Sequence, residues 1–170
     1  MVFVRSDFYG PLERNRLRAA IGLGRMVPAE IYSDGYHADQ QARRAYEVEV
    51  DEDLIVDVQR ALEAVRPEVS RFFDIPLTGN EGPGFVRYLA GGFYRRHCDV
   101  LDEFPRRISV VVFLTTSGID SDGGALRIYR PDVLDIVPEA GTLVAFPADV
   151  PHEVLPVTTG VRDVVVDWFY

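Results

Sequence analysis

The sequence lacks most features that mark secreted, membrane-spanning or multidomain proteins. It contains one cysteine in 170 residues, which excludes an internal disulfide framework and fits a reducing compartment. No apolar run approaches the roughly 18 residues of a membrane-spanning segment, and no signal peptide is visible. No internal repeat or low-complexity segment occurs either. These absences predict a soluble, cytoplasmic protein.

Positive charge is also scarce. The net charge of -9 and the pI of about 4.8 disfavour nucleic acid and anionic membranes as partners, because both select proteins with a positive face. The acidity excludes neither a small molecule nor a basic peptide. With 170 residues and 47% hydrophobic content, the chain has enough apolar material for one domain spanning residues 1–170.

Apolar spacing predicts two helices before residue 84. The first runs from Pro11 to Ile21, and the second from Asp53 to Asp74, with apolar residues three and four apart and Asp51 or Asp53 as its cap. Pro67 is expected to kink this helix or to begin another, because proline removes a backbone donor. Val27 to Tyr46 reads as a strand fragment followed by a long loop, which is a candidate lid. His37, on this loop, is expected to be a solvated side chain rather than a ligand.

After residue 84 the pattern changes to short strands separated by glycine and proline. Eight strands in this region, with helices before them, predict a mainly β fold with supporting helices, namely a double-stranded β-helix (a cupin-like jelly roll). Residues 1–83 would supply helical support and the lid loop, and residues 84–170 the β core. The expected strands are Phe85 to Ala90, Phe93 to His97, Arg107 to Thr115, Ala125 to Arg130, Val133 to Val137, Thr142 to Phe146, Glu153 to Val157 and Arg162 to Tyr170.

A histidine and a carboxylate, His97 and Asp99, stand two residues apart at the end of an expected strand. Residues two apart on a strand point to the same face, and His152 would complete a set of two histidines and one carboxylate. Such a set leaves coordination positions open, as in non-haem Fe(II) oxygenases. By spacing alone, a more frequent outcome is a surface hydrogen-bonding pair with His152 packed elsewhere.

Arg162 adds a second signal, at the start of the last expected strand. Alternation along this strand aims four side chains inward: Arg162, Val164, Val166 and Trp168. A buried guanidinium is costly unless it meets an anion, and no acidic residue is an obvious partner. A dicarboxylate ligand held by paired hydrogen bonds would satisfy it. A surface arginine on an edge strand is the alternative.

These motifs together resemble the prolyl-hydroxylase-like branch of the Fe(II)/2-oxoglutarate-dependent dioxygenases, and most closely the catalytic domain of oxygen-sensing prolyl hydroxylases. The resemblance covers roughly Phe85 to Tyr170, with four separated motifs in the family's order. The motifs are Tyr88-Leu89-Ala90-Gly91 followed by His97-Cys98-Asp99, Gly123-Gly124-Ala125-Leu126-Arg127-Ile128-Tyr129, Pro151-His152-Glu153-Val154, and Arg162 with Trp168-Phe169-Tyr170.

The resemblance implies Fe(II) held by the catalytic residues His97, Asp99 and His152. It implies 2-oxoglutarate on the metal, anchored by Arg162 near Tyr88, with O2 as the oxidant and ascorbate as a candidate reductant. The expected reaction is hydroxylation of an aliphatic C–H on a small molecule, an amino acid or a peptidyl (proline-like) residue, with release of succinate and CO2. The aspartate at 99 speaks against halogenation, while desaturation and cyclisation use the same ligands.

Some positions depart from the family pattern. Phe113 stands where close relatives often present a tyrosine hydroxyl to 2-oxoglutarate, so Thr115 or Thr142 is the candidate replacement, with Thr142 the cofactor-binding residue that we select. Cys98 is expected to face away from the ligands and to pack. Val164 to Trp168 lack the second arginine of the nucleic-acid demethylase branch.

Arg95, Arg96 and Arg127 are expected to be solvated rim charges that could steer an acidic substrate. A cupin-type metal-binding isomerase and a non-catalytic binding module are the alternative functions. The substrate and the oligomeric state stay open at this stage.

Overall fold

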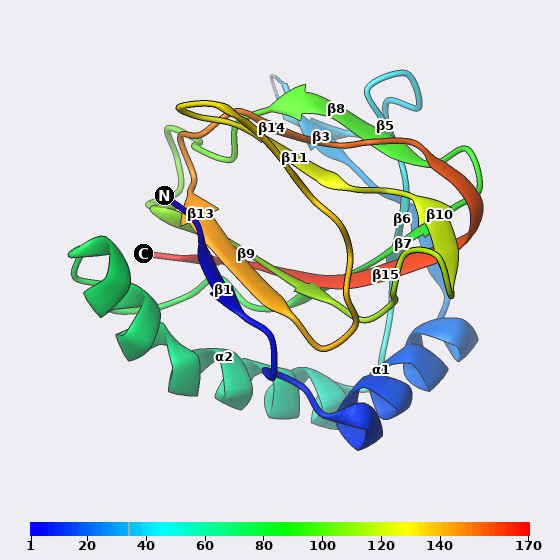
Figure 1. Cartoon of the computed structure of the whole chain (residues 1–170), viewed down its shortest axis with the longest axis horizontal. Coiled ribbons are helices and arrows are strands. Elements are labelled where there is room, and N and C mark those ends of the chain that lie inside the picture. The colour runs from blue at the N-terminus through cyan, green and yellow to red at the C-terminus, as the bar shows by residue number, and fades with distance from the viewer. Residues whose placement is uncertain (34) are drawn as a thin grey trace.

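Two antiparallel sheets face each other across a buried interior, as Figure 1 shows for the computed structural model, which describes residues 1–33 and 35–170. The larger sheet has eight strands: β1 (Phe3–Arg5), β2 (Met26–Pro28), β6 (Tyr46–Val48), β7 (Gly84–Leu89), β9 (Ile108–Phe113), β10 (Ser121–Gly123), β13 (Leu143–Pro147) and β15 (Val157–Phe169). Their spatial order is β1-β13-β9-β15-β7-β6-β2, with β10 paired to β15.

The smaller sheet has five strands: β5 (Arg43–Arg44), β8 (Phe93–His97), β11 (Leu126–Tyr129), β12 (Val133–Ile136) and β14 (His152–Val154). Their order is β12-β11-β14-β8-β5, and a separate hairpin pairs β3 (Ile31–Tyr32) with β4 (Tyr36–His37). This is the mainly β, double-stranded β-helix architecture that the strand pattern predicts. The division at residue 84 stays a prediction, although β1, β2 and β6 from before it extend the larger sheet.

The larger sheet is buried on both faces. Residues that alternate along its strands go in turn to the interior between the sheets and to the opposite face, so Val164 lies in the interior and Val165 on the other side. All six residues of β9 are buried, as expected for a strand covered on both faces. Trp168, expected to face inward, is the cross-strand partner of Ser109 and stacks against Arg106, whose guanidinium carbon lies 3.8 Å from the ring centre.

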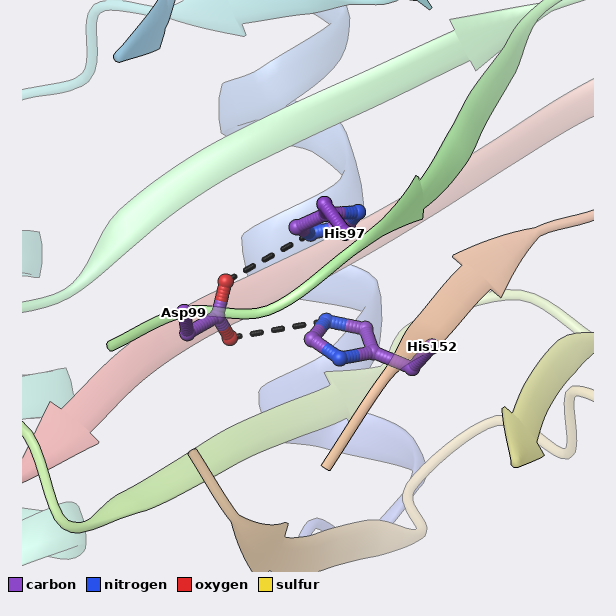
Figure 2. A group of neighbouring side chains, drawn as sticks. All are labelled: His97, Asp99 and His152. Carbon is purple, nitrogen blue, oxygen red and sulfur yellow. Dashed lines mark ion pairs between the residues drawn. The ribbon is translucent and has the colours of Figure 1, made fainter. Parts of the chain in front are cut away.

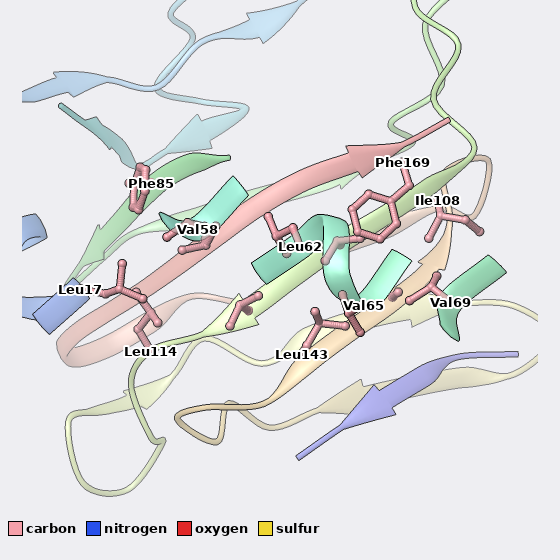
Figure 3. Close-up of a cluster of buried hydrophobic side chains, with 14 of the residues drawn as sticks. Leu17, Val58, Leu62, Val65, Val69, Phe85, Ile108, Leu114, Leu143 and Phe169 are labelled. Carbon is pink, nitrogen blue, oxygen red and sulfur yellow. The ribbon is translucent and has the colours of Figure 1, made fainter. Parts of the chain in front are cut away.

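Helices cover the outer face of the larger sheet, as the sequence predicts. The helix α1 (Pro11–Leu23) and the longer α2 (Glu52–Phe73) lie along this face in Figure 1. Their apolar stripes enter one core with the sheet, shown in Figure 3, and each such side chain contributes roughly 1.5–3 kcal/mol of burial free energy. The buried helix residues are Leu17, Ile21, Leu54, Val58, Leu62, Val65 and Val69. No helix among the described residues is long and apolar enough to cross a membrane.

Of the two outcomes expected at Pro67, the start of another helix does not occur, because α2 runs as one helix from Glu52 to Phe73; the kink stays a prediction. Pro67 lies on the exposed side of α2, where water can solvate the carbonyl that loses its donor, while Val65 and Val69 on either side are buried. Asp51 occupies the expected N-cap position but makes no side-chain capping bond.

The strands expected after residue 84 are present, with shifts at several ends. β8 has the expected bounds, whereas β14 covers only His152–Val154 and β15 begins at Val157 rather than at Arg162. The early part of β15 pairs with β10, which the sequence analysis missed, because neither segment shows apolar alternation. Val27 to Tyr46 contains the β3–β4 hairpin and β5 within the expected loop; residue 34 lies outside the described residues, and the lid role stays a prediction.

Candidate metal centre

Three side chains of metal-ligand type converge at the facing ends of β8 and β14. His97 ends β8, Asp99 follows two residues later, and His152 opens β14, where it is the cross-strand partner of His97. One ligand atom from each of the three residues lies within 4.8 Å of the others. Figure 2 shows the carboxylate between the two rings, with Nε2 of His97 at 3.4 Å from Oδ1 and Nε2 of His152 at 3.5 Å from Oδ2. The sequence alternative of a separately packed His152 is therefore wrong.

Both imidazoles are held in the orientation that a metal ligand needs. Nδ1 of His97 lies 2.8 Å from the carbonyl of Arg95, and Nδ1 of His152 lies 3.0 Å from the carbonyl of Val150. A carbonyl only accepts, so each Nδ1 carries the proton and donates it. The lone pair of a neutral ring is then on Nε2, the atom that faces Asp99.

The surroundings set the charges of Asp99 and His152. Burial alone would raise the pKa of Asp99, but the neighbouring side chains of His97 and His152 and the hydroxyl of Ser109 bring it well below its usual range. Burial also lowers the pKa of the His152 imidazole. An ionised carboxylate beside a neutral imidazole is the protonation state that divalent metal binding requires.

Ser109, which the sequence analysis did not select, holds the carboxylate. Its hydroxyl donates to Oδ2 of Asp99 over 2.6 Å, and the amide of Asp99 donates to the carbonyl of Ala148 over 2.9 Å. Ser109 is 1% exposed and lies on β9, in the opposite sheet from the histidines. In the sequence, Ser109 is marked only as a single hydroxyl residue within the otherwise apolar run of β9.

Tyr94 was also missed. Its ring stacks on His97 with centroids 3.5 Å apart and planes 18° apart. Strict alternation would put residues 94 and 97 on opposite faces, but the register shifts between the His152–His97 and Val154–Tyr94 pairs. The extra residue of this bulge returns Tyr94 to the side of His97, as bulges near functional sites often do. Phe146 packs against His152 edge-on, with ring centroids 4.7 Å apart and planes 67° apart.

Arg162 is buried in the interior between the sheets with one atom unpaired. The side chain is 1% exposed, its Nε donates to the carbonyl of Gly124 over 2.8 Å, and its Nη1 has no partner among the described residues. The guanidinium carbon lies 4.9 Å from the ring centre of Tyr88 and 5.4 Å from that of Phe113. Burial lowers the pKa of Arg162, because the charged guanidinium is less favourable in the interior than in water. An incoming carboxylate would stabilise the charged form.

The double glycine of the second motif makes room for Arg162. Both Gly123 and Gly124 have positive φ, at 74° and 69°. A Cβ on Gly124 would lie 2.7 Å from Cδ of Arg162, and one on Gly123 would lie 2.3 Å from the carbonyl oxygen of Pro156. Only glycine suits both the backbone and the space at these positions.

The structure distinguishes the two threonines proposed to replace the missing tyrosine hydroxyl. Phe113 is fully buried and offers no hydroxyl, and Thr115 already accepts a hydrogen bond from the amide of Asp163 over 3.1 Å. Thr142 Oγ1 is buried without a partner among the described residues. Thr142 therefore has a free hydroxyl directly before the first residue of β13. The cofactor-binding roles of Thr142 and Tyr88 stay predictions.

Other singled-out residues lie outside this centre. His37 is exposed, with Nδ1 3.2 Å from the carbonyl of Gly35. Cys98 does not pack as expected: it is exposed, and its thiol points to the carbonyl of Asp149 at 3.5 Å. Arg127, expected to be a solvated rim charge, forms an ion pair with Asp135 at 2.6 Å.

Comparisons with known proteins agree with this geometry. The family model of the 2OG-Fe(II) oxygenase superfamily matches residues 83–170. A Pseudomonas putida prolyl-4-hydroxylase structure is 26% identical, with a TM-score of 0.80, covering 99% of this chain and 91% of that chain. A Trichoplax adhaerens prolyl hydroxylase, in complex with a hypoxia inducible factor oxygen degradation domain peptide fragment, is 19% identical, with a TM-score of 0.84, covering 99% and 83%.

A viral collagen prolyl hydroxylase from Paramecium Bursaria Chlorella virus-1, solved as a 2OG complex, is 19% identical, with a TM-score of 0.68, covering 99% of this chain and 94% of that chain. At identities of 19%, this structure and the Trichoplax one show the shared fold alone. No curated protein sequence matches the chain significantly.

Proposed function

Because the chain belongs to the 2OG-Fe(II) oxygenase superfamily, we propose that it hydroxylates an unactivated aliphatic C–H of a small molecule, an amino acid or a peptidyl, proline-like residue. The chain is a 2-oxoglutarate-dependent non-haem iron dioxygenase, and its cofactors are Fe(II), 2-oxoglutarate and O2. The proposal concerns the residues that serve them and the class of substrate.

One observation carries the assignment of the metal ligands, namely the convergence of two oriented imidazoles on one carboxylate. Nε2 of His97, Nε2 of His152 and an oxygen of Asp99 would hold Fe(II), since these donor types lie within 4.8 Å of one another. Three protein ligands leave the remaining positions for 2-oxoglutarate and O2. Both Nδ1 atoms are already committed to carbonyls, so neither ring can turn over without losing a hydrogen bond.

Arg162 would bind the distal carboxylate of 2-oxoglutarate. Its unpaired Nη1 lies in the interior that also contains Phe146, which packs against His152. The free hydroxyl of Thr142 is a candidate second donor to the cosubstrate, in place of the tyrosine that Phe113 lacks. Without an anion, a buried guanidinium with an unsatisfied donor costs several kcal/mol, which favours a ligand here over a purely structural role.

Bound Fe(II) supplies the reaction of O2 with 2-oxoglutarate, which yields succinate, CO2 and a substrate carrying one new oxygen atom. The chain's own contribution is to position and to shield. Asp99 stays ionised and fixed by Ser109, Tyr94 and Phe146 brace the two imidazoles, and the apolar interior keeps water from the reacting atoms.

The substrate class rests on weaker support than the metal centre. The 26% identical Pseudomonas putida structure is a prolyl-4-hydroxylase, and the Trichoplax structure holds a peptide, so a prolyl peptide is the first substrate to try. Selectivity is expected in Val27 to Tyr46 and in Leu101 to Arg106, because loop segments carry much of the binding specificity of a fold. The cupin-type isomerase and the non-catalytic module are less suitable, because neither needs a buried, unpaired Arg162.

Succinate formation tests the proposal. The protein is incubated aerobically with Fe(II) and 2-oxoglutarate against a panel of proline-containing peptides and a panel of free amino acids. We expect at least one panel to stimulate succinate release above the uncoupled rate, with a mass gain of one oxygen atom in the substrate and no stimulation in His152→Ala. Stimulation without oxygen transfer would contradict hydroxylation, and equal turnover by His152→Ala would contradict the ligand assignment.

A further inference from the structure

Among the residues that the structure describes, three arginines on the outer surface of the smaller sheet have no carboxylate partner. The chain contains no lysine, so all 18 of its basic residues are arginines. Among the described residues, nearly all of these side chains form an ion pair or donate a hydrogen bond. The exceptions are Arg44, Arg95, Arg96 and Arg107, and the first three lie together on β5 and β8.

These three arginines lie against two aromatic rings. The guanidinium carbons of Arg44 and Arg95 lie 5.5 and 5.9 Å from the ring centre of Phe93, and that of Arg96 lies 4.2 Å from the ring centre of Tyr129. All three arginines are exposed. The aromatic contacts hold the guanidinium groups in place without neutralising their charge. We call Arg44, Arg95, Arg96, Phe93 and Tyr129 the arginine patch.

Two acidic side chains of the smaller sheet are committed to other partners. Asp135 and Glu153 lie on the same sheet, but Asp135 pairs with Arg127, and Glu153 accepts the hydroxyl proton of Tyr129 and lies 3.9 Å from Arg127. A protein of net charge -9 has many carboxylates with which to neutralise three arginines. Leaving them unpaired on one surface provides a site for an anion from outside the chain.

The patch lies on the strand that carries the metal ligand. Arg96 directly precedes His97, and adjacent residues on a strand point to opposite faces, so the guanidinium reaches outward while the imidazole reaches inward. The neighbouring strand β5 is the edge of the sheet. A polypeptide bound at the metal could pass over this edge and reach the patch with about four to six extended residues, since a strand rises roughly 3.3 Å per residue.

We propose that the arginine patch binds an acidic segment of a polypeptide substrate, on a stretch flanking the residue that enters the metal centre. This proposal rests on the proposed function and selects a peptidyl over a free small-molecule substrate. Charge complementarity supports that occupant, because a protein of net charge -9 repels aspartate- and glutamate-rich chains overall, whereas the unpaired arginines of the patch attract carboxylates. Planar arginine forks also match carboxylates in geometry.

Peptide binding to the full-length protein tests the proposal without turnover. A fluorescein-labelled glutamate-rich peptide with a central proline is titrated and followed by anisotropy, beside the same peptide with glutamine at every glutamate. The patch variant is Arg44→Gln, Arg95→Gln, Arg96→Gln. The matched control, Arg60→Gln, Arg71→Gln, Arg107→Gln, removes the same charge from outside the patch.

We expect the wild type to prefer the glutamate peptide, with an affinity that falls as salt rises, and the patch variant to bind it roughly tenfold or more weakly. The control should stay within about twofold of the wild type. Equal binding by the patch variant, or equal binding of the two peptides by the wild type, overturns the proposal. If the triple variant does not fold, the single Arg96→Gln variant should still show weaker binding.

Two further measurements separate this proposal from others. Mn(II) and 2-oxoglutarate affinities should be unchanged in the patch variant; if the wild type binds neither, the proposed function fails while the peptide result stands on its own. Sedimentation identifies a second copy as occupant: a wild-type dimer that the patch substitutions dissociate would overturn the assignment to an acidic substrate segment. A double-stranded DNA probe that outcompetes the glutamate peptide would overturn it as well.

Discussion

The hydroxyl of Ser109 donates a hydrogen bond of 2.6 Å to Oδ2 of Asp99 and so joins the larger sheet to the metal centre. The two histidines come from the smaller sheet, whereas the carboxylate lies on the segment between β8 and β9. Without this bond, one end of the carboxylate would depend on the histidines alone. Ser109 therefore ties the larger sheet to the point where the metal ligands meet.

Removing this hydroxyl should weaken metal binding. Ser109→Ala is expected to lower the affinity for Mn(II) roughly 10- to 100-fold, because groups that orient a metal ligand have effects of this size. The fold should be kept, since the change removes one buried atom. Isothermal titration with Mn(II) measures the effect, and Ser109→Thr, which retains the hydroxyl, should recover most of the affinity. An unchanged affinity in Ser109→Ala would rule out the positioning role.

Replacing Arg162 should separate stability from cosubstrate binding. Arg162→Met removes a buried charge with an unpaired donor, so the free energy of unfolding without ligand should rise or stay within about 1 kcal/mol. The affinity for 2-oxoglutarate should fall by roughly a hundredfold, because charge-assisted hydrogen bonds are lost. Urea unfolding and equilibrium binding measure the two quantities. A strongly destabilised variant that still binds 2-oxoglutarate would show that Arg162 is structural.

Arg87 provides the matched control. It pairs with Asp163 through two hydrogen bonds of 2.8 and 2.9 Å, and the Asp163 side chain is 1% exposed. Arg87→Met leaves that carboxylate buried and unpaired, which should cost about 3–5 kcal/mol of unfolding free energy. Its affinity for 2-oxoglutarate, measured on the folded fraction, should be close to that of the wild type. The same substitution thus has opposite effects at two buried arginines.

Asp167 predicts a dependence of stability on pH. Burial raises its pKa above the usual 3.8, although Asn80 and the amides of Trp168 and Gly82 donate to it. While the carboxyl is protonated in both the folded and the unfolded protein, its raised pKa does not change the unfolding free energy. As pH rises through the folded-state pKa, the unfolding free energy decreases. The unfolding free energy of the wild type relative to Asp167→Asn should therefore decrease from below pH 3.8 towards neutrality. A relative stability that instead increases with pH would contradict this account.

Local patterns in the sequence predict much of the framework. The apolar stripe of α2, the bounds of β8 and the proximity of His97 to Asp99 follow from periodicity, because they depend on near neighbours in the chain. His152 approaches His97 and Asp99 only through the pairing of strands that are distant in the sequence. The sequence alone therefore left open that His152 packs separately.

The missed features have non-local causes. Tyr94 faces His97 only because of a bulge that is visible as a register shift between two strands. Ser109 reaches Asp99 across the interior, and β10 exists only through its pairing with the early part of β15. Whether Pro67 ends α2 depends on which side of the helix faces water, which the local sequence pattern does not define.

Anaerobic titration of Fe(II) into the protein with 2-oxoglutarate tests the central claim most directly. The account predicts a visible metal-to-ligand charge-transfer band in the wild type, because His97, Asp99 and His152 would hold Fe(II) with positions left open for the cosubstrate. The band should be absent in His97→Ala and should need far more 2-oxoglutarate in Arg162→Met. A wild type without the band, or a His97→Ala variant with an unchanged band, would contradict the assignment of this centre.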